Sequence, residues 1–170
     1  MSRVRSIPAV LALLAVAIWL GGLLALGAIA APVVFSVVPA PSSADAMTIV
    51  FRRFDLVAMA CAALVLSVEA TRALAREPFG VSDHLRVAAS ALAGALAVLE
   101  GAFVSPRIAA LHWAGAVRGL GTAGIELARL HNVAEACGKA QAGLLVAIVA
   151  LQVVALRAPP VQPARLSSPG

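Results

Sequence analysis

Residues 6–44, SIPAVLALLAVAIWLGGLLALGAIAAPVVFSVVPAPSSA, contain no charged side chain over 39 positions. A helix needs only roughly 20 apolar residues to cross about 30 Å of hydrocarbon, so this stretch is long enough to span a membrane. The whole chain is similar in character, with 62% hydrophobic and 12% charged residues over 170 positions and a mean hydropathy of +0.99. A soluble domain is nearer half apolar and about a quarter charged. The sequence therefore predicts an integral membrane protein.

The start of the chain, MSRVR followed by apolar residues, is also typical of a cleaved signal peptide. The small residues AIAAP at 28–32 would then be the processing site. The apolar stretch before that site exceeds 20 residues, which is longer than the roughly 7 to 15 of a signal core. We therefore expect an uncleaved first span.

Start and stop signals divide the chain into helices. Four spans are predicted, at about residues 8–34, 46–75, 83–104 and 123–157. The SPR sequence at 105–107 is expected to end the third, because proline disfavours helix in the residue before it. A short amphipathic piece and a turn should follow up to residue 122. We expect residues 1–157 to form an all-α membrane domain, a four-transmembrane-helix bundle, and the Pro- and Ser-rich residues 158–170 to be a disordered tail.

The second predicted helix is the least apolar of the four. Its uninterrupted apolar core covers only 13 residues, 56–68, between Asp55 and Glu69. To span a membrane it must place FRRFD (51–55) at one interface and EATR (69–72) at the other.

The net charge of +5 does not indicate nucleic-acid binding. The 12 Arg and one Lys are spread over loops and termini, and few aromatic residues are present to stack on bases. Contact with lipid headgroups explains them better. With the N-terminus inside, seven basic residues lie inside and six outside, a margin too small to set the orientation. The excess of Arg over Lys and the alanine richness suggest a bacterial inner membrane.

Small residues recur at spacings of four in the first span, around Gly21 and Ala25, and could form a packing face for a second copy or a membrane partner. General alanine richness is the alternative explanation.

Cys61 and Cys137 both lie in or beside apolar segments, so we expect them to pack as small apolar side chains, although a disulfide stays open.

Polar side chains gather where the first loop meets the other helices. Placing the four helices side by side brings one set to this end: Arg52, Arg53, Asp55, Glu100, Arg107, His112, His131, Glu135, Lys139 and Gln141. The opposite end has mainly charges that look interfacial: Glu69, Arg72, Arg76, Glu77 and Asp83. A charge inside hydrocarbon costs about 2.5 to 3.5 kcal/mol, so such residues should face one another or a wet cavity. The candidate binding cluster is Arg52, Asp55, Glu100, Arg107, His131 and Glu135.

Simple ion pairs explain part of this cluster. Glu135 and Lys139 are four residues apart in the favourable order on a helix, and Asp55 follows Arg52 and Arg53 closely. A metal site is the alternative, because His131 and Glu135 have the i, i+4 spacing of zinc-binding helices. Such a site would need a third ligand from His112 or Glu100.

Four sequence stretches together resemble a known family. They are WLGGLLALGAIAAPVVF (19–35), FRRFD (51–55), SPRIAALH (105–112) and LARLHNVAEACGKAQAGL (127–144). Their order and spacing resemble the four-span membrane proteins called domain of unknown function 4149, which include the eukaryotic transmembrane protein 205. This chain departs from the pattern at Leu127, where such proteins tend to have an aromatic residue. The resemblance implies a four-helix membrane bundle without a settled activity. The family is distantly similar to copper resistance protein D and to membrane-bound protoporphyrinogen oxidases, which are linked to copper and haem. This similarity favours a metal or haem site as the alternative to a protein without a cofactor, although fold similarity alone does not transfer function.

Three functions follow as hypotheses. No nucleotide-binding loop, CxxC, HExxH or nucleophile elbow occurs in the chain, so the first is a non-enzymatic binding or transport-accessory module without a cofactor. The second is a redox or copper-handling protein that binds haem or a transition metal through His131, Glu135 and His112. The third is a structural subunit that packs against membrane partners through its first span.

Overall fold

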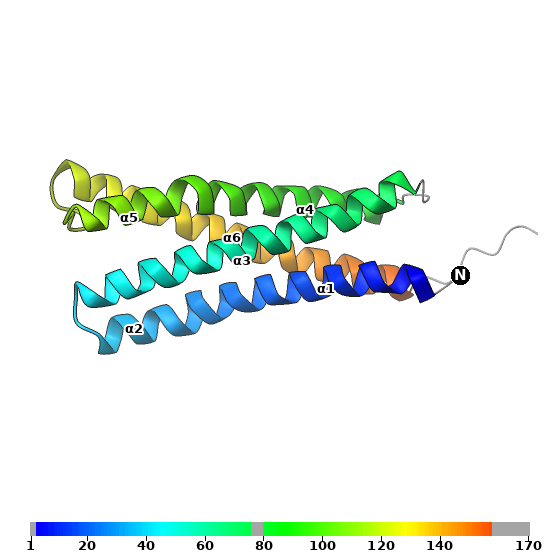
Figure 1. The fold of residues 1–170 in the computed structure, drawn as a ribbon, viewed down its shortest axis with the longest axis horizontal. Helices are drawn as coiled ribbons and strands as arrows, with labels where there is room; N and C mark the ends of the chain where they lie inside the picture. The colour runs from blue at the N-terminus through cyan, green and yellow to red at the C-terminus, as the bar shows by residue number, and fades with distance from the viewer. Residues whose placement is uncertain (1–2, 76–79, 158–170) are drawn as a thin grey trace, which may run out of the picture.

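All of the regular structure in residues 3–75 and 80–157, the part described by the computed structural model, is helical (Figure 1). The first continuous helical segment consists of α1 (Arg3–Leu24), the π-helix η1 (Ala25–Ala30) and α2 (Ala31–Val37). The second is α3 (Ser42–Leu74). The third consists of α4 (Val81–Leu99), the π-helix η2 (Glu100–Val104) and α5 (Ser105–Trp113), and the fourth is α6 (Gly121–Arg157). The predicted all-α class is confirmed, while the predicted tail at 158–170 lies outside the described residues.

The helical segments run alternately up and down along one axis. The start of α1, the end of α3 and the end of α6 lie at one end of the molecule, and the α2–α3 and α5–α6 connections lie at the other (Figure 1). We call the latter, formed by the connections at 38–41 and 114–120, the first-loop end. The segment α1 packs against α3 and α6, and α4 also packs against both. Each segment therefore contacts two neighbours around a common core.

The outer surface of the molecule is apolar. Large hydrophobic side chains point outward from several segments, among them Leu14, Ile18, Leu92 and Val146. Three segments are long and apolar enough to cross a membrane: Ile7–Val37, Val81–Trp113 and Gly121–Val154. An apolar exterior of this kind is stabilised by lipid rather than water, which supports the membrane assignment.

Small residues let the helices approach closely in the core. Ala58, Ala62, Ala93 and Ala97 are buried there, around the fully buried ring of Trp19. At Gly22 of α1, the ring of Phe54 occupies the position that a Cβ atom would take. Because Gly22 has no side chain, α1 and α3 can come into close contact at this point, as is typical of helices that pack in a membrane.

Each π-helix ends two residues before a proline. Proline removes a backbone donor and its ring clashes with the carbonyl four residues earlier, which for Pro32 and Pro106 falls inside η1 and η2. A wider turn relieves this clash, and in η2 the Ser105 N–H bonds to the Glu100 carbonyl five residues back. The third helix was expected to end near 104. It instead continues through Pro106 to Trp113, so the amphipathic piece expected after Ile108 is a continuation of this segment.

A buried ion network closes the end opposite the first loop. Arg86 of α4 donates from Nε and Nη2 to the two carboxylate oxygens of Glu69 at 2.7 and 3.1 Å. Arg86 is 3% exposed and Glu69 4%. Asp83 contacts Arg86 at 3.0 Å and Arg72 at 3.3 Å, and Arg72 also contacts Glu69. Glu69, which was expected at the interface, is buried among the helices, and Arg86 neutralises its charge there. The expected interfacial residues Arg76 and Glu77 lie outside the described residues.

Candidate binding cavity

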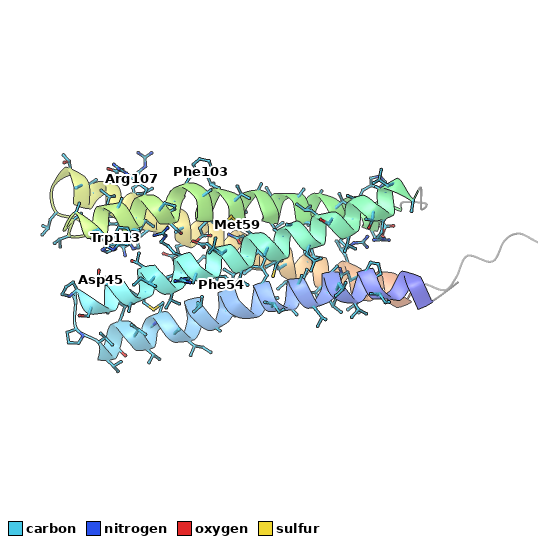
Figure 2. The ribbon with its side chains drawn as sticks, viewed as in Figure 1. Asp45, Phe54, Met59, Phe103, Arg107 and Trp113 are labelled. Carbon is cyan, nitrogen blue, oxygen red and sulfur yellow. The ribbon has the colours of Figure 1, made fainter. Side chains whose placement is uncertain are left out.

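A cavity of about 550 Å³ opens between the helical segments toward the first-loop end. Its walls are mostly apolar and include the side chains of Leu23, Phe35, Met47, Phe51, Phe54 and Ile108. Phe54 projects from α3 toward the α1 and α2 side, and Trp113 marks the first-loop end of α5 (Figure 2). The polar lining comes mainly from residues predicted at this end: Arg52, Asp55, Glu100, His112, His131, Glu135, Lys139 and Gln141. The predicted gathering of polar side chains is therefore seen, except that Arg107 and Arg53 do not line the cavity.

Gln141 connects three helical segments at the inner part of the cavity. The Trp19 indole N–H donates to Gln141 Oε1 at 3.1 Å, and Gln141 Nε2 donates to Glu100 Oε2 at 2.7 Å. Trp19 and Gln141 are each 1% exposed. A buried amide that is bonded on both sides fixes the rotation of α1, η2 and α6 relative to one another. It also gives one oxygen of Glu100 a donor.

Asp55 is the second carboxyl group of this inner region. It is 8% exposed, and Ser105 of α5 lies beside it. Its Oδ2 atom has no hydrogen-bond partner in the described part of the chain, so the expected pairing with Arg52 or Arg53 is not seen at this atom.

Gly101 brings the two carboxyl groups together. A Cβ atom on this residue would lie 3.1 Å from Cβ of Asp55 and 3.1 Å from Cε of Met59, which is tighter than ordinary van der Waals contact. The missing side chain lets α3 approach η2 at the residue next to Glu100. Asp55 therefore packs against the residue next to Glu100, and both acidic residues line the cavity.

His112 and His131 meet across α5 and α6. Their ring centroids are 5.7 Å apart, with an interplanar angle of 84°. The Nδ1 atom of His131 lies 2.8 Å from the Leu127 carbonyl, so this nitrogen carries the hydrogen and Nε2 is left to face other groups. The backbone geometry of α6 thus selects one tautomer of His131.

The remaining predicted cluster members form pairs at or outside the rim. Lys139 donates to Glu135 at 2.6 Å, which confirms the predicted ion pair. The guanidinium of Arg52 lies 5.8 Å from the centroid of the Trp113 ring. Arg107 points away from the cavity and makes a bidentate ion pair with Glu126 at 2.7 and 3.1 Å (Figure 2). These contacts neutralise or shield the charges near the cavity mouth.

The predicted metal ligands are brought together only in part. His112 and His131 adjoin, whereas Glu135 is held by Lys139 at 2.6 Å. Within residues 3–75 and 80–157, no group of three or more His, Cys, Asp or Glu side chains is placed to hold a metal ion. Cys61 and Cys137 are both free and buried.

Two of the most informative residues were not singled out from the sequence. Neither Trp19 nor Arg86 belongs to the predicted polar cluster. A signal existed for each, because an indole N–H in an apolar helix needs an acceptor and a charge within HLRVAAS (84–90) needs a counter-ion. The identity of each partner depends on helix rotation, which the sequence does not show.

These features agree with a comparison against known families. The family model described as "Domain of unknown function (DUF4149)" matches residues 14–117. The chain belongs to this DUF4149 family. The matched range contains Trp19, Asp55 and Glu100, and it ends before Gln141 and His131. No curated protein and no solved structure matches this DUF4149 chain.

Proposed function

We propose that this DUF4149 protein crosses the membrane four times and is a non-enzymatic binding module whose cavity takes up a small amphipathic molecule. The observation that carries the proposal is the apolar cavity of about 550 Å³, at whose inner part a buried carboxyl oxygen of Asp55 has no partner among the described residues. Small-molecule sites in proteins are mostly apolar clefts of about 300 to 1,000 Å³ with a few polar groups that fix orientation.

The segment α3 is proposed as the fourth span, which completes a four-transmembrane-helix bundle. Its 33 residues correspond to about 50 Å of helix, more than the hydrocarbon thickness. Its two inward acidic residues do not face lipid: Glu69 is neutralised by Arg86, and Asp55 faces the cavity. A helix with this burial pattern is stable in a membrane only when its neighbours enclose it.

The test is photolabelling of the full chain in lipid nanodiscs with a neutral apolar diazirine, mapped by peptide mass spectrometry. We expect saturable labelling of cavity residues that excess unlabelled probe competes away. Ala142 lines the cavity, so Ala142→Phe should abolish this labelling. Ala147→Phe, which places the same ring on the exposed face of α6, is the matched control and should not. Weak, non-saturable labelling that Ala142→Phe leaves unchanged would refute a binding cavity.

The second candidate function is metal or haem binding in a redox or copper-handling protein, with ligands from His131, Glu135 and His112. The adjacent imidazoles, 5.7 Å apart, favour it. Absorbance spectra and elemental analysis of protein purified in mild detergent provide the test. A Soret band or near-stoichiometric copper, zinc or iron that disappears in His131→Ala would support it. Metal-free protein from cells grown with added copper and iron would refute it.

We also propose which membrane holds the protein and which face contacts a partner. Arginine and alanine richness supports a bacterial inner membrane. Gly21 and Ala25 are exposed on the first segment and are proposed as a contact face for a second copy or a membrane partner. Cysteine crosslinking through Ala25→Cys should capture such a partner, and exclusively monomeric chains would exclude the contact.

A further inference from the structure

We propose that the molecule bound in the cavity is an organic cation, an ammonium or phosphonium group on an apolar body, and that the Asp55 carboxylate is its counter-ion. This inference rests on the proposed function and specifies its ligand class. It depends on the charge and the hydrogen-bond state of the groups at the inner part of the cavity.

Asp55 has the carboxylate oxygen that the cation would contact. More than nine-tenths of its surface is buried, it lines the cavity, and its Oδ2 atom has no partner within the described ranges. A buried carboxylate oxygen without a donor costs free energy, and native structures rarely leave one unsatisfied. Neither Arg52 nor Lys139 donates a hydrogen bond to this oxygen, because Arg52 lies over Trp113 and Lys139 donates to Glu135. A ligand with positive charge would satisfy this carboxylate oxygen.

Glu100 adds a second negative group beside Asp55. Gln141 supplies one donor to it, and the oxygen of the same amide accepts the Trp19 indole N–H. Two ionised carboxylates close together in apolar surroundings repel each other and lack water to solvate them. A single cation between them removes both difficulties. An anionic ligand at this position would instead be repelled by both carboxyl groups.

The cavity walls determine the rest of the ligand. Phe35, Phe51 and Phe54 supply aromatic rings, and Leu23 and Met47 supply aliphatic surface. Aromatic faces attract organic cations, and apolar walls fit the body that carries the charge. An inorganic ion fits less well. Calcium and magnesium require about six or more oxygen ligands, whereas no cluster of three candidate metal ligands occurs among the residues described.

The charges at the cavity mouth favour a lipophilic cation over a small hydrated one. Arg52 and Arg118, which donates to Asn132 at 3.3 Å, place positive charge at the mouth, whereas Glu135 neutralises Lys139 there. The carboxyl groups of Asp55 and Glu100 lie further in. A small hydrated cation would be repelled at the mouth without gaining contact with the apolar walls. A lipophilic cation can enter through its apolar body and gains the carboxylate contact only once inside.

The experiment compares two ions of the same shape and opposite charge in zwitterionic phosphatidylcholine nanodiscs. Tetraphenylphosphonium and tetraphenylborate each compete with the neutral diazirine probe for the cavity of the full chain. Empty nanodiscs correct for the partitioning of each ion into lipid. We expect tetraphenylphosphonium to displace the label at a concentration lower by on the order of tenfold, the effect of one charge-assisted contact.

Two variants test whether Asp55 causes the preference for the cation. Asp55→Asn keeps the size of the side chain and should remove most of the preference for the cation while neutral labelling persists. Asp45→Asn is the matched control, because Asp45 is an exposed acidic residue on the same helix that does not line the cavity (Figure 2). It should leave the preference unchanged. The comparison of the two ions on the native chain stands even where Asp55→Asn does not fold.

The outcomes separate the two proposals. Saturable neutral labelling with equal displacement by both ions overturns the cation proposal and leaves the binding cavity in place. Equal cation preference in Asp55→Asn and the native chain overturns the role of Asp55. No saturable labelling by any probe overturns both.

Discussion

Replacing one member of the buried Glu69 and Arg86 pair should destabilise the protein, whereas replacing both should not. The pair is bidentate at 2.7 and 3.1 Å, with side chains 5% and 4% exposed, and it joins α3 to α4 at the end opposite the first loop. Arg86→Met leaves the Glu69 carboxylate buried with a weaker partner. Glu69→Met leaves the Arg86 guanidinium buried with a weaker partner.

The magnitude follows from the partners that remain. Breaking a buried ion pair by removing one charge costs about 3 to 5 kcal/mol. Here Arg72 still contacts Glu69 at 3.3 Å after Arg86 is lost, and Asp83 still contacts Arg86 at 3.0 Å after Glu69 is lost. We therefore expect each single variant near the lower limit, about 3 kcal/mol. The double variant keeps Arg72 and Asp83 paired at 3.3 Å and strands no charge, so its unfolding free energy should equal or exceed the native value.

The assay is SDS titration of the purified chain in detergent micelles, with helical circular dichroism as the signal and all four proteins forming a double-mutant cycle. Glu135→Gln is the control, because the Glu135 and Lys139 side chains are exposed and their pair should contribute no measurable stability. Additive losses in the double variant, or single variants as stable as the control, would show that the network does not hold α3 to α4.

Two further substitutions test the packing around the cavity by the same titration. Gly22→Ala must displace the Phe54 ring and should cost about 1 to 3 kcal/mol, whereas Gly143→Ala, with open space beside it, should not destabilise; equal effects would contradict the close contact. Gln141→Leu leaves the Trp19 indole and Glu100 without partners and should cost about 1 to 3 kcal/mol, with altered Trp19 fluorescence in a Trp113→Phe background. Unchanged stability and emission would show that the amide bridge is not formed.

The helices could be predicted from the sequence because length and apolar content are sufficient to identify them. Their ends could not all be predicted, since a proline gives the same local signal whether it ends a helix or is accommodated in it. At Pro106 the helix continues because the π-helix η2 forms a hydrogen bond over five residues instead of four. Close packing of Asp55 and Met59 against Gly101 holds that turn in place, and this contact comes from a helix far away in sequence.

The composition of the candidate site was more predictable than its contacts. Alternating helix directions determine which residues share an end, so the grouping of Asp55, Glu100 and His131 followed from the span order alone. Pairing depends on the rotation of each helix about its axis, where about 100° separates neighbouring residues. Arg107 therefore faces Glu126 outside the cavity, and the partners of Glu100 could not be assigned in advance.

The two polar regions of α3 should act independently, which bears on how loss of binding is interpreted. Asp55 and Glu69 are fourteen residues apart on this helix, or about 21 Å along its axis. Substitutions separated by more than about 10 Å without shared partners have additive effects. Glu69 bonds to Arg72 and Arg86, and Asp55 lies beside Ser105 and Glu100, so the two sets have no member in common. Loss of cation preference in Asp55→Asn would therefore report on the cavity itself, and destabilisation at Glu69 should leave that preference unchanged for as long as the chain stays folded.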